Sequence, residues 1–156
     1  AYCTRVESGP FPSEQTDDTG NTLRNKGNEF ASTTGRPRRC GWLDIPALKY
    51  AIMINGVTRL FMTKSDVMSG FDNVRVCTSY MWENRECEEI PFDSRKIQPV
   101  YTVLPGWKEE IREMRNFGDL PVNLKGYIEF IEYHTGVPVT MVSVGPDRRE
   151  TIFRNQ

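Results

Sequence analysis

Three arginines crowd into four positions at residues 36–39, where Arg36, Arg38 and Arg39 follow a Thr-Thr-Gly turn. A guanidinium group presents a planar fork of N–H donors that matches carboxylates and phosphates. Hydroxyls, a flexible glycine and free backbone N–H groups add further donors in the same loop. Because apolar sequence starting at Trp42 follows at once, the loop is tied to a core. We therefore expect an anion-binding loop made of Ser32, Thr33, Thr34, Gly35, Arg36, Pro37 and Arg38.

A second candidate is the segment Thr-Lys-Ser-Asp at residues 63–66, at the end of an apolar run. Ligands of open α/β sheets bind at the carboxyl ends of the strands. There the carboxylate of Asp66 could accept hydrogen bonds from N1–H and N2–H₂ of guanine, for which adenine has no matching donor pair. The aliphatic stem of Lys64 could lie along the base. Taken alone, these four residues are more typical of the ordinary start of a loop.

A third candidate closes another apolar run at residues 143–146, Ser-Val-Gly-Pro. Ser143 and the backbone of Val144 and Gly145 could line a nucleotide base, while Pro146 fixes the turn. By itself this segment is typical of a turn at a strand end. If the two strand ends meet, they together predict one site for a nucleotide base.

One alternative concerns Gly-Arg-Pro at residues 35–37, which is also typical of arms that enter the minor groove of A·T-rich DNA. Such arms are basic on both sides, whereas residues 27–34 here read GNEFASTT. The net charge of −1 also differs from the positive excess of general nucleic-acid binders. We expect no nucleic-acid partner and keep the DNA arm as an alternative interpretation.

Several other classes of site find no support in the sequence. No apolar run approaches the roughly 20 residues of a membrane helix, so no membrane partner is expected. The cysteines Cys3, Cys40, Cys77 and Cys87 form no CxxC pair, which argues against a metal site, and reduced thiols are preferred over disulfides. There is no GxxxxGK[ST] loop and no Ser/His/Asp or Cys/His set. If the protein binds a nucleotide, the phosphate loop is therefore not in these residues.

The pattern of apolar residues, turns and caps predicts an α/β fold, with a mostly parallel sheet flanked by helices and a small antiparallel excursion. A hairpin around Asn84 would make the excursion. Asp44 and Asp119 would cap helices. The expected strands are 1–6, 59–66 (buried on both faces), 73–82, 86–92 and a final strand 138–144, and the expected helices are 17–30, 45–56, 108–117 and 121–135.

Six segments, taken in order, resemble the C-terminal part of adenylosuccinate synthetase: SGPFPSE, TTGRPRRCGWLD, INGVTRLFMTKSDV, LPGW, YIEFIE and VSVGPDRRETI. The resemblance covers essentially the whole chain and implies the C-terminal part of a larger P-loop-like synthetase fold. Residues 1–156 would form one segment of that domain. Its parts would be the substrate-loop region 1–43, the helix and guanine-reading strand end 44–72, the antiparallel excursion 73–105, and the helices and final strand 106–156.

The resemblance implies a GTP-dependent ligase of purine nucleotide biosynthesis, which joins L-aspartate to IMP and forms adenylosuccinate, GDP and phosphate. By motif, the loop Ser32–Arg38 would close on L-aspartate, Arg36 would also contact IMP, and Arg38 would also reach the GTP phosphates. Guanine would be recognised by Lys64, Ser65, Asp66, Ser143, Val144 and Gly145. The chain differs from the family's usual pattern at Glu7, Gln15 and Ser65.

The family's catalytic Asp and His, its glycine-rich phosphate loop and the expected Mg²⁺ ligands belong to an N-terminal portion that is absent from this sequence. The resemblance therefore implies no catalytic residue in this segment, and we expect the chain alone to be inactive. The full-length enzyme is expected to be a cytoplasmic homodimer that binds IMP, L-aspartate and GTP with Mg²⁺. The alternative is a stand-alone, non-catalytic module that binds guanine nucleotides or dicarboxylates.

Overall fold

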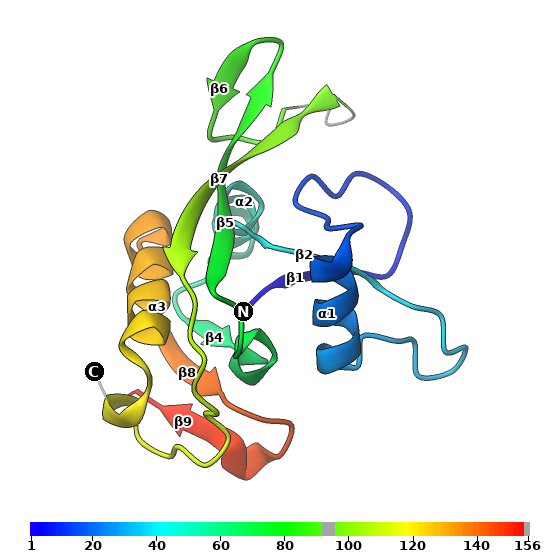
Figure 1. The fold of residues 1–156 in the computed structure, drawn as a ribbon. Coiled ribbons are helices and arrows are strands. Elements are labelled where there is room, and N and C mark those ends of the chain that lie inside the picture. The colour runs from blue at the N-terminus through cyan, green and yellow to red at the C-terminus, as the bar shows by residue number, and fades with distance from the viewer. Residues whose placement is uncertain (92–95, 155–156) are drawn as a thin grey trace. The chain divides into compact units, whose positions relative to one another are not determined.

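The computed structural model describes residues 1–91 and 96–154 (Figure 1). The described chain divides into two compact units. The first unit consists of Ala1, Leu48–Val74 and Val103–Gln156, and the second consists of Tyr2–Ala47 and Arg75–Thr102. Helices and strands occur together, so the predicted α/β class is confirmed.

The first unit is built on a three-stranded sheet of order β4-β8-β9. Strands β4 and β8 run parallel, and β8 pairs antiparallel with β9. The long helix α3 buries Leu124, Tyr127, Ile128 and Ile131, which recur at helical spacing along one face. The elements are β4 (Leu60–Met62), 3₁₀-helix η1 (Ser65–Met68), 3₁₀-helix η3 (Phe117–Asp119), α3 (Val122–Thr135), β8 (Val139–Ser143), 3₁₀-helix η4 (Arg148–Glu150) and β9 (Thr151–Phe153).

The prediction that the strand within 59–66 is buried on both faces is wrong, because Phe61 is 63% exposed. Phe61 pairs with Met141, and Met141 pairs with Phe153, so these side chains form a row across the sheet. The opposite side chain of the strand, Met62, is buried. Alternation of side chains therefore gives this sheet one buried and one apolar, open face. Because the open face also carries apolar residues, the sequence of the strand lacks the alternation of apolar and polar residues that marks a strand with one exposed face.

The second unit contains an antiparallel pair, β1 with β2, and a ladder in which β3 runs parallel to β5 and β6 antiparallel to it. Strand β7 also pairs with β5. The predicted hairpin is confirmed, and Glu83 and Asn84 at its turn both have positive φ, as a tight two-residue turn requires. The elements wholly in this unit are β1 (Cys3–Arg5), α1 (Asp18–Gly27), β2 (Arg39–Gly41), β3 (Leu43–Asp44) and β6 (Arg85–Cys87). Three more have residues in both units: α2 (Ile45–Asn55), β5 (Asn73–Trp82) and β7 (Gln98–Pro105).

Three of the four predicted helices are present, and two begin and end as local chemistry dictates. Asp17 caps α1 by accepting hydrogen bonds from the N–H groups of Thr19 and Gly20. Asp44 accepts from the N–H of Ala47 at the start of α2, which confirms its predicted capping role. Helix α2 ends at Asn55, and Gly56 follows with φ 60°.

The predicted helix 108–117 is wrong, since the structure has turns there and only η3 at its end. Within residues 108–117 only Ile111 is buried, so the segment has no continuous apolar face. A polar helix without a packed face has little to offset its ordering cost. Asp119 does not cap α3, because it lies in η3 and Pro121 takes the cap position. Strand 138–144 is present as β8 but is not the last strand, since β9 follows it.

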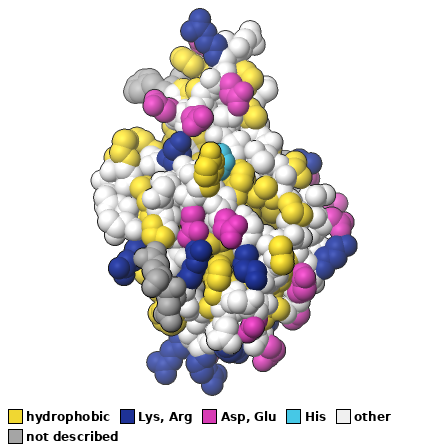
Figure 2. Space-filling model, turned by 90° about the vertical axis from the view of Figure 1, so that its left-hand side faces the viewer, with side chains coloured by type: hydrophobic (Ala, Val, Ile, Leu, Met, Phe, Trp, Pro, Cys, Tyr) yellow, Lys and Arg dark blue, Asp and Glu magenta, His cyan; other side chains and the backbone are white. Residues whose placement is uncertain are grey.

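Apolar side chains also reach the surface of α3, where Val122 and Tyr133 are exposed. Figure 2 views the molecule from the side of α3 and shows hydrophobic side chains there among acidic and basic ones. Single apolar residues on a folded surface are ordinary, so we assign no function to them.

Candidate functional site

The two predicted strand-end turns meet at one edge of the first unit's sheet. Strands β4 and β8 are parallel neighbours, and Met62 of β4 pairs with Val142 of β8 (Figure 1). The chain leaves β4 into Lys64–Asp66 and leaves β8 into Val144 and Gly145. Since the carboxyl ends of parallel strands lie at the same edge, these turns form one cluster, which is where open α/β sheets bind ligands.

Asp66 is the most enclosed charged group of this cluster. Its side chain is only 8% exposed, and its Oδ2 lies 3.2 Å from Nη2 of Arg112. Lys64 precedes it with φ 60°, a left-handed conformation that side chains rarely adopt and that is found preferentially at functional sites. Ser65 between them is buried, and its hydroxyl has no hydrogen-bond partner among the described residues. A hydroxyl and a carboxylate are therefore held side by side in the chain.

The turn after β8 is shaped by Glu150. The N–H of Val144 donates to the carbonyl oxygen of Glu150 over 2.8 Å. A Cβ atom on Gly145 would lie 2.4 Å from the Glu150 carboxylate, so this side-chain position has to stay small unless Glu150 moves. The Ser143 hydroxyl donates to the carbonyl oxygen of Gly145 over 2.8 Å. The turn thus presents backbone and a small hydroxyl rather than bulky side chains.

The predicted anion-binding loop lies in the second unit and is exposed from Ser32 to Pro37. The N–H of Gly35 donates to the carbonyl oxygen of Ala31 over 2.8 Å, and the N–H of Ala31 donates to that of Arg36 over 2.9 Å. Gly35 has φ 65°, which explains why glycine occupies this position. The Arg36 guanidinium has no hydrogen bond or ion pair to any residue that the structure describes. Its donors are available to a ligand.

Arg38 differs from Arg36 because its guanidinium is part of the fold. Its Nη1 lies 3.1 Å from Oε2 of Glu29, whose side chain is only 4% exposed, and 37% of the Arg38 side chain is exposed. The Tyr2 hydroxyl donates to Oε1 of Glu29 over 2.9 Å. Nε of Arg24 donates to the Arg38 carbonyl oxygen over 2.8 Å. One side of the guanidinium is thus fixed by a buried carboxylate, while the other reaches solvent.

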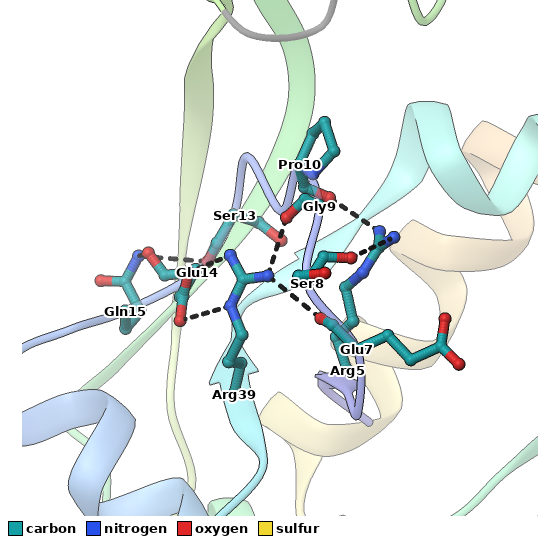
Figure 3. A network of polar contacts seen from close by, with 9 residues as sticks. All are labelled: Arg5, Glu7, Ser8, Gly9, Pro10, Ser13, Glu14, Gln15 and Arg39. Carbon is teal, nitrogen blue, oxygen red and sulfur yellow. Dashed lines mark hydrogen bonds and ion pairs between the residues drawn. The ribbon is translucent and has the colours of Figure 1, made fainter.

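Arg39, the third arginine of the cluster, holds a neighbouring loop (Figure 3). Its Nε lies 2.9 Å from Oε1 of Glu14 and its Nη2 2.5 Å from Oε2, a two-point contact that raises the pKa of Arg39. Its Nη1 donates to the carbonyl oxygen of Gly9 over 2.7 Å. Arg5 likewise donates to the carbonyl oxygen of Pro10. These two arginines bind the protein's own backbone and serve the shape of residues 7–10.

Sequence reasoning missed a buried cluster around Asp44 in the second unit. The Tyr80 hydroxyl donates to Oδ1 of Asp44 over 2.6 Å, and burial raises the pKa of both groups. Burial also raises the pKa of Cys3 to about 11 and that of Cys77 to about 12. At neutral pH both thiols are protonated and weakly nucleophilic. Beside the cluster lies an open cavity of about 350 Å³, lined by Cys3, Thr4, Arg5, Pro10, Phe11, Pro12, Asp44, Ala47, Tyr80 and Ile90.

Comparison with known proteins gives a consistent result. The family model described as adenylosuccinate synthetase matches residues 1–152. The chain belongs to the adenylosuccinate synthetase family. Among curated relatives, the enzyme of that name from Flavobacterium psychrophilum is 54% identical over 156 residues, and that from Halothermothrix orenii is 52% identical over 159 residues. These matches cover 99% and 100% of this chain.

A solved structure agrees with the family assignment. The fully ligated adenylosuccinate synthetase from Plasmodium falciparum superposes with a TM-score of 0.94 at 40% sequence identity, over 99% of this chain. The chain spans 37% of the length of the curated relatives and 38% of that structure. The family predicted from the sequence is therefore confirmed, and the chain corresponds to part of the length of these synthetases.

Residues 1–91 and 96–154 of this synthetase chain contain no group of three His, Cys, Asp or Glu side chains that could hold a metal ion. Within the same residues, no helix is long and apolar enough to cross a membrane.

Proposed function

We propose that this chain is part of a GTP-dependent ligase that joins L-aspartate to IMP. The observation that carries the proposal is the meeting of Lys64–Asp66 with Ser143–Gly145 at the ends of two parallel strands. A buried carboxylate at such an edge suits a base with two adjacent N–H donors, which guanine has and adenine lacks. Family membership supplies the reaction with which this base recognition is consistent.

In the proposed reaction the γ-phosphoryl group of GTP is transferred to the 6-oxygen of IMP. The amine of L-aspartate then attacks carbon 6, phosphate leaves with that oxygen, and the amine gives up a proton. All three substrates are anionic, so cationic donors are needed to offset their repulsion. We assign this role to the loop Ser32–Arg38, with Arg36 toward aspartate and IMP and Arg38 toward aspartate and the GTP phosphates.

Within the first unit, we assign guanine recognition to Lys64, Ser65, Asp66, Ser143, Val144 and Gly145. Asp66 would accept from N1–H and N2–H₂, and the stem of Lys64 would lie along the base. The catalytic groups are proposed to lie outside this chain. Homodimeric assembly, a cytoplasmic location and a Mg²⁺ requirement stay predictions.

The test compares GDP with IDP, which lacks only the 2-amino group, by calorimetric titration of this chain. One hydrogen bond to a carboxylate is worth about 1.5–3 kcal/mol, so GDP should bind about 10- to 100-fold more tightly than IDP. Asp66→Asn should remove that preference by lowering GDP affinity. Asp72→Asn is the matched control, because Asp72 lies in the same unit on the surface and pairs with Lys108. Equal binding of GDP and IDP by the unmodified chain would refute the assignment.

A further inference from the structure

Arg112 lies in the segment that was expected to be a helix, and its position is fixed by its neighbours. Trp107 and Ile111 are both fully buried, and the carbonyl oxygen of Trp107 accepts a 2.7 Å hydrogen bond from the N–H of Gly70. The N–H of Met114 donates to the carbonyl oxygen of Ile111 and closes a turn around Arg112. Two buried anchors therefore place the backbone of Arg112 beside the turn that follows β4.

From this position Arg112 reaches the carboxylate assigned to guanine. Its Nη2 lies 3.2 Å from Oδ2 of Asp66. Asp66 is enclosed, whereas the Arg112 side chain is 51% exposed. An enclosed carboxylate is poorly hydrated and needs a donor, while an exposed guanidinium loses little when it turns back to water. The contact is therefore needed by Asp66 more than by Arg112.

The two donors have related chemistry. The N1–C2–N2 edge of guanine is itself a cyclic guanidine fragment, with two roughly parallel N–H donors. An arginine side chain offers the same kind of fork without the base. A donor from Arg112 at Oδ2 occupies an acceptor that the base would use for its own N–H group.

We propose that Arg112 is an internal occupant of the base site, which satisfies Asp66 in the unliganded protein and must turn away when guanine binds. The proposal rests on the assignment of Asp66 to guanine made above. Guanine binding then requires that the exposed ion pair between Arg112 and Asp66 is broken. Since only the molecules without this ion pair can bind the base, the observed affinity is lower than the affinity of the open site. For a pair of this exposure the reduction is about two- to five-fold.

The test measures guanosine and GDP binding to the unmodified chain, Arg112→Ala and Arg112→Gln. Both substitutions should tighten both ligands about two- to five-fold. Guanosine is the decisive ligand because it is uncharged, whereas the loss of a cation could weaken GDP binding through its phosphates. Lys108→Ala is the matched control: it removes a positive charge from the same segment, but its partner is Asp72. It should leave guanosine binding unchanged.

The Asp66→Asn background separates the two proposals. If Asp66→Asn abolishes the preference for guanine and Arg112→Ala leaves guanosine binding unchanged or weaker, the occupant proposal is wrong and the guanine site stands. If Asp66→Asn has no effect on guanine binding, the site assignment fails and the occupant proposal falls with it. Support requires tightening in Arg112→Ala that disappears when Asp66→Asn is also present.

Discussion

Substitution of Arg38 should destabilise the protein, whereas substitution of Arg36 two residues earlier should not. Arg38→Ala removes a charge-assisted hydrogen bond at 3.1 Å between Arg38 and the enclosed Glu29 carboxylate. Such bonds are worth about 1.5–3 kcal/mol. Because over a third of the Arg38 side chain meets solvent, which already screens the pair, we expect the lower part of that range, about 1.5–2 kcal/mol. For a chain of this length the loss corresponds to a fall in Tm of about 3–8 °C.

The assay is equilibrium urea unfolding of Arg36→Ala and Arg38→Ala, each compared with the unmodified chain. Arg36→Ala should stay within about 0.5 kcal/mol, as for other exposed substitutions. A double-mutant cycle with Glu29→Gln then measures the coupling between Glu29 and Arg38, which should be about 1–2 kcal/mol. Equal stability of the two alanine variants would refute the claim that Arg38 is part of the fold.

Two further predictions concern the second unit. Tyr80→Phe removes a donor from the buried Asp44 carboxylate and should cost about 1.5–3 kcal/mol in urea unfolding at pH 7. Burial raises the pKa of Asp44, so the folded state keeps its proton to higher pH than the unfolded state. The contribution of Asp44 to the unfolding free energy is fully present below about pH 4 and is lost as the pH rises through the folded pKa. The unfolding free energy of Asp44→Asn should therefore rise relative to that of the unmodified chain between about pH 4 and 7. A constant difference in unfolding free energy across that range would contradict this. Gly41→Ala would place Cβ 2.2 Å from the Ser13 carbonyl oxygen and should cost about 3 kcal/mol, whereas Gly118→Ala, with open space around it, should change the melting temperature little.

The strand ends at the edge formed by β4 and β8 could be predicted, because each is marked by residues that are adjacent in the sequence. Lys64–Asp66 and Ser143–Gly145 each follow directly on a short apolar run, and a polar turn after such a run predicts a strand end. What the sequence leaves open is whether two strands are neighbours. That depends on pairing between residues 80 positions apart, as in the register of Met62 with Val142.

The contacts that could not be anticipated are those whose partners are distant or ordinary in sequence. Tyr80 sits in an apolar strand with no sign that its hydroxyl meets Asp44, 36 residues earlier. Arg112 stands in a stretch that predicts a polar amphipathic helix, whereas the structure has turns there and buries Trp107 and Ile111. In both cases the packing of apolar neighbours decides where the polar group points.

The arginine cluster shows why charge cannot be counted from sequence alone. Arg38 is paired with Glu29 and Arg39 with Glu14, so two of the three cations are already compensated within the described chain. Arg36 has no such partner among the described residues, so of these three arginines it is the one that offers an uncompensated charge to an anion. Replacing Arg36 should therefore weaken anion binding without loss of fold, whereas replacing Arg39 should first release the loop that it holds. The three positions look equivalent in the sequence, and the placement of two glutamates makes them different.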